Sequence, residues 1–510
     1  MNDNTKLDVL IVGGGPAGTT LGIELRRRGI DVRIVDKASS GFAGSRAKGI
    51  QPRTLEIMED LGALDDILDG GSLYPRMGIH AGPLVVPWAM IKVNKPSERV
   101  PYPSTWLIPQ HRTDRALHHR LEELGGRIDY QCEVYDLEQD ENGVTVEIST
   151  PTGDEAVRAK FVVGADGGSS VVRKSVGIAF EGTTDEEDRM LIVDAVVEGD
   201  LSRKYWHIWP VGGKFVGACP LPDSNLFQWM IKLDPDETPP TTAEAITGRV
   251  RARTKKKLRL TDIAWQSVFR PNIRIAAKYR KGRVLLVGDA AHVHPPAGAQ
   301  GLNTGVQDSY NLGWKLAGVL QGASDTLLDS YEAERQPVAA TVLGLATKKY
   351  DAIATMSPAA LARGKDEYQL AVTYNGGPLA SSANASTSTL AAGDRAPDAR
   401  LDRDGTTTRL FELFRGTHFP AIAYGPGAPE ALASIEWPTF GAELRTIAID
   451  ASNATADDVV SDIDRSFRSA YGVSRPTAFL VRPDGYIAAI ALVDELEPIT
   501  AVVSTMTSMS

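Results

Sequence analysis

The stretch that decides the fold lies near the N-terminus and reads Leu7-Asp-Val-Leu-Ile-Val-Gly13-Gly-Gly15-Pro-Ala-Gly18. Its first six residues are typical of a buried strand, and the glycines allow a tight turn into a helix whose positive N-terminus favours a pyrophosphate. A second strand, Val32 to Val35, ends in Asp36, about 20 residues beyond the glycines, where a carboxylate accepts hydrogen bonds from a ribose 2′-OH. The unit predicts a dinucleotide site, and Asp36 favours the unphosphorylated adenosine ribose of NAD or FAD.

Two later motifs point to the same dinucleotide. They are Gly164-Ala-Asp166-Gly167, with Arg173 behind it, and Gly288-Asp289-Ala-Ala-His292, which follows the strand-like segment Arg283 to Val287. Because segments with a different pattern of predicted secondary structure separate the three motifs, we predict a nucleotide-binding domain that is discontinuous in sequence.

Composition narrows the function classes. The chain has 510 residues, which suggests roughly three domains, and its apolar (42%) and charged (24%) fractions are typical of a globular protein. A net charge of −10 repels polyphosphate chains, which argues against nucleic-acid binding. The one basic run, Arg251 to Lys257, is expected on the solvated face of an amphipathic helix.

Cysteine usage and the polar start predict a cytoplasmic protein. Only Cys132 and Cys219 are present, without a CxxC pattern, which suits a reducing compartment. The polar residues Met1 to Lys6 run directly into the first predicted strand, so no signal peptide is expected, and no apolar stretch is long enough for a membrane span. His292 and His294 suggest a metal site, but no carboxylate or cysteine completes a ligand set, so no metal is predicted.

The predicted secondary structure changes after Gly167. Short, aromatic-rich strand candidates (192–197, 205–209, 214–220 and 226–233), with a further one from Trp265 to Arg274, predict a largely antiparallel second domain. Helices are expected over 303–350, a linker over 376–392, and then a third domain with a helix from Asp457 to Tyr471. The predicted boundaries are 1–76, 101–187 and 278–390 for the nucleotide domain with its connecting helices, 77–100 and 188–277 for the second domain, and 391–510 for the third.

Around Gly164 to Arg173 and Gly288 to Asn303, the chain resembles the group A FAD-dependent aromatic hydroxylases of the p-hydroxybenzoate hydroxylase superfamily. Within them it is most similar to the phenol hydroxylase and aromatic polyketide hydroxylase branch. The resemblance implies an α/β fold with a three-layer Rossmann-like FAD domain and an antiparallel-sheet substrate domain. Residues 392–398 and 476–485 resemble that branch's C-terminal thioredoxin-like domain. Here this domain has no cysteine, so we expect a structural or homodimer-forming role.

The resemblance also implies which residues hold FAD. Arg46 would neutralise phosphate charge, Gln110 would touch the ribityl chain, and Asp289 would bind ribitol hydroxyls. Pro295 would lie against the isoalloxazine, and the helix that opens at 301–303 would stabilise negative charge on the reduced flavin. The predicted cofactor-binding residues are Gly13, Gly15, Pro16, Ala17, Gly18, Asp36, Lys37, Arg46, Gln110, Val134, Asp166, Gly167, Asp289, Pro295, Gly298, Gly301, Leu302 and Asn303.

As the resemblance implies, NADH or NADPH reduces the flavin, O2 adds at C4a, and the C4a-hydroperoxyflavin hydroxylates a phenolic or polycyclic aromatic substrate. The substrate cavity should lie between the flavin and the sheet of the second domain. The predicted wall residues are Trp206, Trp209, Phe215, Gln228, Trp229, Ser267 and Phe269, although aromatics at strand spacing are also typical of plain core. His207 is the candidate base, because a neutral imidazole accepts a phenolic proton. The Asp, Arg and Tyr cluster of better-known phenol hydroxylases has no match here.

Two alternatives from other classes stay open at this point. A flavin-dependent halogenase shares the scaffold, but Trp206-His-Ile-Trp209-Pro has the wrong spacing for the halogenase Trp-x-Trp-x-Ile-Pro stretch. The other is a non-catalytic flavin carrier that binds a hydrophobic ligand. Within the monooxygenase class, biosynthesis, degradation and antibiotic inactivation are equally compatible with the residues.

Overall fold

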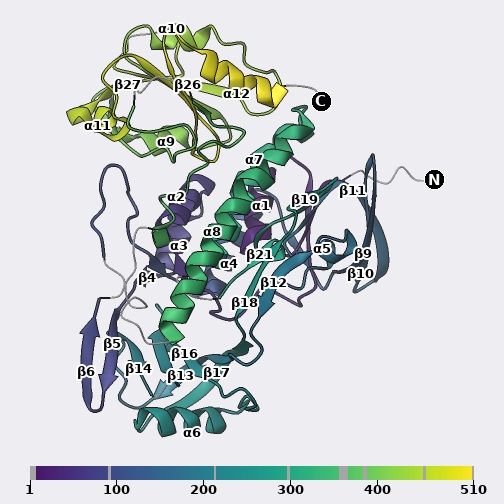
Figure 1. Cartoon of the computed structure of the whole chain (residues 1–510), viewed down its shortest axis with the longest axis vertical. Coiled ribbons are helices and arrows are strands. Elements are labelled where there is room, and N and C mark those ends of the chain that lie inside the picture. The colour runs from purple at the N-terminus through teal and green to yellow at the C-terminus, as the bar shows by residue number, and fades with distance from the viewer. Residues whose placement is uncertain are drawn as a thin grey trace.

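The computed structural model describes residues 7–89, 93–211, 214–295, 299–354, 366–382, 388–451 and 455–507. Gly298, one of the predicted cofactor residues, lies outside these ranges. Three sheet-based bodies follow one another along the long axis of the molecule (Figure 1). The body that contains the N-terminal strand lies in the middle, the second sheet with α6 lies at one end, and the C-terminal body lies at the other.

The middle body is built on an eight-stranded sheet in the order β19-β20-β11-β1-β2-β8, with β10 and β9 added beside β11. The pairs β1–β2, β1–β11, β2–β8 and β11–β20 are parallel. The strands are β1 (Leu7–Val12), β2 (Val32–Asp36), β8 (Ile128–Tyr130), β9 (Glu133–Asp140), β10 (Gly143–Thr150), β11 (Gly153–Gly164), β19 (Arg280–Lys281) and β20 (Val284–Leu286). One sheet thus unites three distant segments of the chain, as the three motifs predict.

Helices cover this sheet and join it to the neighbouring bodies. They are α1 (Pro16–Arg26), α2 (Pro52–Leu61), α3 (Leu64–Asp69), α4 (Gln110–Glu123), α5 (Val171–Ser175), α7 (Gly301–Leu320) and α8 (Asp329–Ala354). The 3-10 turn η1 (Gly288–Ala290) follows β20. Two small three-stranded sheets lie beside it. One has the order β3 (Gly49–Ile50), β7 (Trp106–Leu107), β4 (Ser72–Leu73), and the other has the order β12 (Phe180–Thr184), β18 (Asn272–Ala276), β21 (His292–Val293).

The second body is a seven-stranded sheet in the order β17-β13-β16-β15-β14-β5-β6, antiparallel except for the pair β14–β5. Its strands are β5 (Arg76–Ala81), β6 (Leu84–Trp88), β13 (Met190–Glu198), β14 (Tyr205–Trp209), β15 (Val216–Pro220), β16 (Leu226–Lys232) and β17 (Arg259–Phe269). The helix α6 (Ala243–Thr254) packs on it and ends inside the basic run, so the prediction of one helix through Lys257 is wrong. The predicted strand from Trp265 to Arg274 is two strands, β17 and β18, separated at Arg270-Pro271.

The C-terminal body holds a mixed eight-stranded sheet in the order β22-β29-β28-β25-β26-β27-β23-β24. Its strands are β22 (Ser381–Ser382), β23 (Arg400–Arg403), β24 (Thr406–Arg409), β25 (Phe419–Tyr424), β26 (Leu444–Ile449), β27 (Asp458–Asp462), β28 (Thr477–Val481) and β29 (Ile487–Leu492). Its helices are α9 (Leu410–Phe414), α10 (Ala428–Ala433), α11 (Ser466–Tyr471) and α12 (Glu497–Thr507). The predicted helix from Asp457 to Tyr471 is therefore wrong in its first half, where β27 pairs with β26.

Within the described ranges, every helix falls short of the length or the apolar character that a membrane crossing requires. Among the same residues there is no cluster of His, Cys, Asp and Glu suited to a metal ion.

Candidate active site

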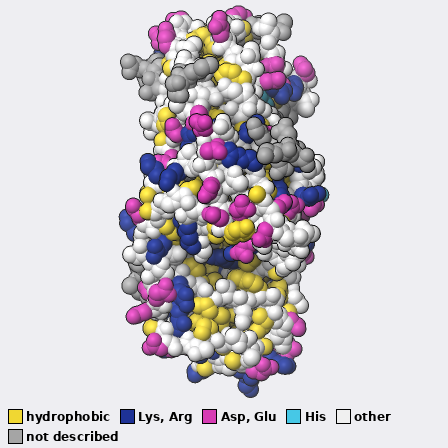
Figure 2. Space-filling view, turned by 90° about the vertical axis from the view of Figure 1, so that its right-hand side faces the viewer, with side chains coloured by type: hydrophobic (Ala, Val, Ile, Leu, Met, Phe, Trp, Pro, Cys, Tyr) yellow, Lys and Arg dark blue, Asp and Glu magenta, His cyan; other side chains and the backbone are white. Residues whose placement is uncertain are grey.

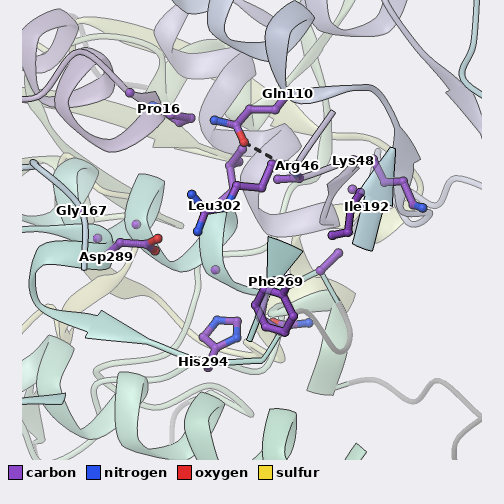
Figure 3. A pocket seen from close by; sticks show the side chains of 18 of the residues that line it. Pro16, Arg46, Lys48, Gln110, Gly167, Ile192, Phe269, Asp289, His294 and Leu302 are labelled. Carbon is purple, nitrogen blue, oxygen red and sulfur yellow. Dashed lines mark hydrogen bonds between the residues drawn. The ribbon is translucent and has the colours of Figure 1, made fainter. Parts of the chain in front are cut away.

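One cavity of about 770 Å³ lies between the middle body and the seven-stranded sheet. At one end it is lined by the turns that follow β1 and β11, the end of β2, η1 and the N-terminus of α7. At the other end it is lined by side chains of β5, β13, β14 and β16. Figure 3 shows the Asp289 carboxylate pointing toward the middle of this space, with Phe269 and His294 beside each other. In Figure 2, hydrophobic side chains gather beside a hollow in the lower third of the molecule.

The glycine turn after β1 is packed closely enough to require glycine. Gly13 has a φ of +112°, and a Cβ there would lie 2.3 Å from the Ala165 carbonyl oxygen. A Cβ on Gly18 would lie 1.9 Å from the carbonyl oxygen of Gly13. At Gly15, in contrast, a Cβ would meet no heavy atom within 4 Å. The turn therefore presses against the sheet on one side and leaves open space on the cavity side.

Two helices begin at the cavity without a capping side chain. Neither α1, with Gly15 at its N-cap, nor α7, with Gln300 there, has a side-chain hydrogen bond to its first turn. The partial positive charge of both N-termini is therefore directed at the cavity, where it favours anionic or electron-rich groups.

The carboxylate of Asp36 is fixed at the end of β2. Its Oδ2 accepts the Gly14 N–H at 2.8 Å, and its Oδ1 accepts the Ala38 N–H at 2.8 Å. Elsewhere on the cavity wall, the Gln110 Oε1 accepts the Ala47 N–H at 3.3 Å, a bond drawn in Figure 3. The exposed Arg46 lies beside this contact and lines the cavity.

A buried ionic cluster holds the turn that carries Asp289. Asp308 on α7 accepts the Gly288 N–H at 3.2 Å, the His292 Nε2–H at 2.6 Å and the Arg335 Nε–H at 2.7 Å. Burial alone would raise the pKa of Asp308, but the charges of Arg335 and His292 outweigh it and lower the pKa. Because these partners bond to Asp308, His292 is a structural residue.

The cavity brings together most of the predicted cofactor residues. Its wall includes Gly13, Gly15, Pro16, Ala17, Asp36, Lys37, Arg46, Gln110, Val134, Asp166, Gly167, Asp289, Gly301 and Leu302. Gly18, Pro295 and Asn303 lie off the wall. The buried Asn303 instead donates to the Gly49 carbonyl at 2.8 Å and accepts the Gln51 N–H at 2.8 Å, so it holds residues 49–51.

Strand alternation decides which predicted substrate residues reach the cavity. On β14, Trp206 and Ile208 line it, whereas Trp209 faces the other side of the sheet. On β16, Gln228 and Met230 line it, whereas Trp229 is fully buried in the core. Phe215 and Phe269 also lie on the wall, and Ser267 does not.

His207, the predicted base, lies off the cavity wall beside a second histidine. Its Nε2–H donates to the Ser202 carbonyl at 2.7 Å, so its Nδ1 accepts the Nε2–H of His80 at 2.8 Å. Burial lowers the pKa of His207. Burial and the neighbouring His207 ring lower the pKa of His80 to about 4. Both rings are neutral and engaged, and the His80 ring stacks on Trp209 at 4.2 Å.

The structure adds cavity residues that the sequence did not reveal. His294 donates from Nδ1 to the Pro295 carbonyl at 2.8 Å, and its buried Nε2 has no hydrogen-bond partner among the described residues. Burial lowers the pKa of His294, so the ring is neutral. Lys48 enters the same wall two residues after Arg46. The apolar wall residues missed are Tyr74, Met77, Ile79, Met190, Ile192, Ile208 and Met230.

A signal for part of this wall was present in the sequence. Ile192 opens the predicted strand 192–197, which the structure extends back to Met190, but alternation along a strand does not say which face meets the cavity.

These residues fit FAD. The open space at Gly15 and the two uncapped helices match a pyrophosphate. The fixed Asp36 matches a ribose, and the inward Asp289 matches a ribityl chain. The buried Oδ1 of Asp166, which has no hydrogen-bond partner among the described residues, adds a further acceptor on the same wall.

Comparison with known proteins identifies the class. The FAD binding domain family matches residues 6–346, and the aromatic-ring hydroxylase C-terminal family matches residues 389–507. The chain belongs to the FAD binding domain family, and it is an FAD-dependent monooxygenase that uses NAD(P)H and O2.

Individual relatives cover nearly the whole chain. A flavin-dependent monooxygenase of Mycobacteroides abscessus is 40% identical over 95% of this chain and 97% of its own length. Pentachlorophenol 4-monooxygenase of Sphingobium chlorophenolicum is 30% identical over 95% of this chain and 94% of its own. The solved structure of aklavinone-11 hydroxylase with FAD and aklavinone superposes with a TM-score of 0.81 and 25% identity, covering 99% of each chain.

Proposed function

We propose that this enzyme hydroxylates a phenolic aromatic compound, bound between the flavin site and the seven-stranded sheet. The observation that carries the proposal is that one continuous cavity of about 770 Å³ is lined by dinucleotide-motif residues at one end and by apolar strand residues at the other. A relative named for pentachlorophenol, a phenol, supports the substrate class.

The chain's own residues supply the environment for this reaction. FAD, when bound and reduced by NAD(P)H, supplies the activation of O2. Gly13, Gly15, Asp36 and Asp289 would hold the cofactor, and the N-terminus of α7 would stabilise negative charge beside it. Trp206, Met230 and Phe269 give the opposite wall an apolar surface that excludes water and accepts a planar ring.

The test is a screen of one-ring to fused polycyclic phenols with the FAD-loaded enzyme, under both NADH and NADPH. We expect at least one phenol to accelerate NAD(P)H oxidation and to gain one oxygen atom, with label from ¹⁸O2 in the product mass. If phenols accelerate NAD(P)H oxidation but all reducing equivalents appear as H2O2, the proposal is wrong.

The oligomeric state and the location of the enzyme are predicted from the sequence alone. Homodimer formation and a cytoplasmic location stay predictions from the sequence. The similarity to monooxygenases and to a hydroxylase argues against the halogenase and non-catalytic alternatives.

A further inference from the structure

Lys48 places an ammonium group at the apolar end of the cavity. It lies on the segment between the flavin motif residue Arg46 and β3, and its Nζ is 4.6 Å from the centroid of the Trp206 ring. In Figure 3 its side chain extends near Ile192, away from Asp289. The surrounding wall is formed by Tyr74, Met77, Ile192, Trp206, Ile208 and Met230.

A hydrogen-bonded network fixes the position of this ammonium. The Gln228 Nε2 donates to the Ser45 carbonyl and to the Ser45 Oγ, both at 2.6 Å, so the Gln228 Oε1 must face the opposite way. There it accepts a hydrogen bond from the Lys48 Nζ. Ser45 is itself anchored, because its N–H and its Oγ–H both donate to the Asp194 carboxylate. The amide orientation of Gln228 is thus set by its partners, and it presents an acceptor that holds the lysine.

Other ionisable groups lie near Lys48. Asp194 interacts electrostatically with Lys48 but lies behind Ser45 and Gln228 and is not part of the cavity wall. Burial raises the pKa of the Cys219 thiol, which therefore stays neutral. Lys232 forms an ion pair with Asp188, which also lines the cavity.

We propose that Lys48 binds the ionised hydroxyl of the substrate, so that the enzyme takes its aromatic substrate as a phenolate. The inference rests on the proposed function and specifies the substrate form and the group that selects it. The phenol O–H bond breaks on binding, its proton goes to the buffer, and Lys48 keeps its own proton. A phenolate ring carbon is more electron-rich than that of the phenol, which suits attack on an electrophilic oxygen.

The expected effect follows from the distance over which such charges act. An opposite charge within about 4–6 Å lowers the pKa of an acid by about 1–3 units. Burial against the apolar wall alone would raise the pKa of the phenol, but it also keeps solvent from screening the ammonium of Lys48, so we expect the charge to outweigh burial. Bound phenols should therefore ionise about 1–3 pH units below their pKa in water, and removing the charge should cancel most of that shift.

The experiment uses the oxidised FAD-loaded enzyme, in which no turnover occurs. Two coloured phenols, 4-nitrophenol and 1-hydroxyanthraquinone, are titrated with pH while bound, and their methyl ethers serve as ligands that cannot ionise. Lys48→Met should return the bound pKa toward the value in water and weaken the phenols about 10- to 1000-fold, with little change for the ethers. Lys48→Arg should restore the lowered pKa. Flavin absorbance and the melting temperature check that the variants are folded.

Lys232→Met combined with Asp188→Asn is the matched control, because it removes a lysine of the same cavity together with the carboxylate that balances its charge. We expect it to change the bound pKa much less than Lys48→Met does. Three results would overturn the inference: wild-type enzyme that binds phenol and ether equally or not at all, a bound pKa unchanged in Lys48→Met, or an equal shift in the double variant Lys232→Met, Asp188→Asn. Oxygen incorporation is scored separately. Hydroxylation with an unchanged bound pKa in Lys48→Met overturns only the role of Lys48, whereas a Lys48-dependent pKa without oxygenated product overturns only the proposed function.

Discussion

Replacing Arg482 by Met should weaken the attachment of the C-terminal body to the rest of the enzyme. Arg482 follows β28 and is buried against α8, where its Nη1 and Nη2 donate to Glu334 at 2.6 and 3.0 Å. The same carboxylate accepts Lys315 from α7 at 2.7 Å, and Asp484 accepts the Arg482 Nε–H at 2.9 Å. The four charges balance. Without Arg482, two buried carboxylates share one lysine.

The size of the loss can be worked from Glu334. Burial alone would raise its pKa, but the charges of Arg482 and Lys315 outweigh burial and hold the pKa at about 2. A fall from the usual 4.5 corresponds to about 3 kcal/mol, close to the 3–5 kcal/mol typical of removing one partner of a buried pair. Because the folded-state pKa is depressed, this contribution is complete above about pH 4.5 and is lost as the pH falls toward 2.

The assay is urea unfolding followed by circular dichroism and by flavin release, with calorimetry to separate the transitions of the bodies. Arg482→Met should lower the free energy of unfolding by about 3–5 kcal/mol. Arg127→Met, which removes an exposed partner of Asp129, should cost less than about 1 kcal/mol. Glu334→Gln combined with Arg482→Met should cost less than the sum of the single changes, because the remaining Lys315 and Asp484 balance. A loss for Arg482→Met no larger than that of Arg127→Met, or strict additivity, would refute the reasoning.

Three further predictions concern the flavin site and its surroundings. Gly13→Ala should yield protein without bound FAD, measured by flavin absorbance, because the new Cβ would lie 2.3 Å from a backbone oxygen. Gly248→Ala on α6, where a Cβ meets no heavy atom within 4 Å, should retain FAD. Burial raises the pKa of Asp114 to about 7, so the folded state holds this proton more tightly than the unfolded state does, and stability falls as the pH rises from about 4 to 7. Asp114→Asn should remove up to about 4 kcal/mol of this pH dependence, measured by urea unfolding at several pH values. An unchanged dependence of the unfolding free energy on pH would contradict the prediction. His207→Gln should lower the melting temperature but leave the pH profile of kcat unchanged, because His207 lies off the cavity wall. Loss of the acidic limb, where a base becomes protonated, would restore His207 as the catalytic base.

The motifs predicted the flavin end because their chemistry is local. A glycine turn, a strand and a carboxylate at the end of the next strand are all set within one unit, so Gly13 and Asp36 lie on the cavity as expected. Asn303 belongs to a motif as well, but its side chain turns to Gly49 and Gln51, more than 250 residues away. Nothing local distinguishes an amide that binds a cofactor from one that holds a distant backbone.

The substrate end was less predictable because both faces of its strands are apolar. Gln228 and Trp229 are adjacent, so they face opposite sides of β16. Which side meets the cavity depends on α6, whose Ile246 and Val250 cover the Trp229 face. The helix predicted from Asp457 fails for a related reason. The apolar Val460 is buried by pairing with the parallel β26, and a partner strand is not visible in a single stretch of sequence.

The segment 45–51 shows how these distant contacts create the site. Ser45 is bonded to Asp194 on β13 and to Gln228 on β16, which ties one end of the segment to the sheet opposite the flavin. Gly49 and Gln51 are bonded to Asn303 in the first turn of α7, which ties the other end to the helix N-terminus directed at the cavity. Lys48 lies between these two anchors, so its ammonium is held at a fixed place relative to both the apolar wall and the helix. A charge intended to select an ionised substrate needs such fixation, because a mobile lysine would reach solvent and lose most of its effect on the bound phenol.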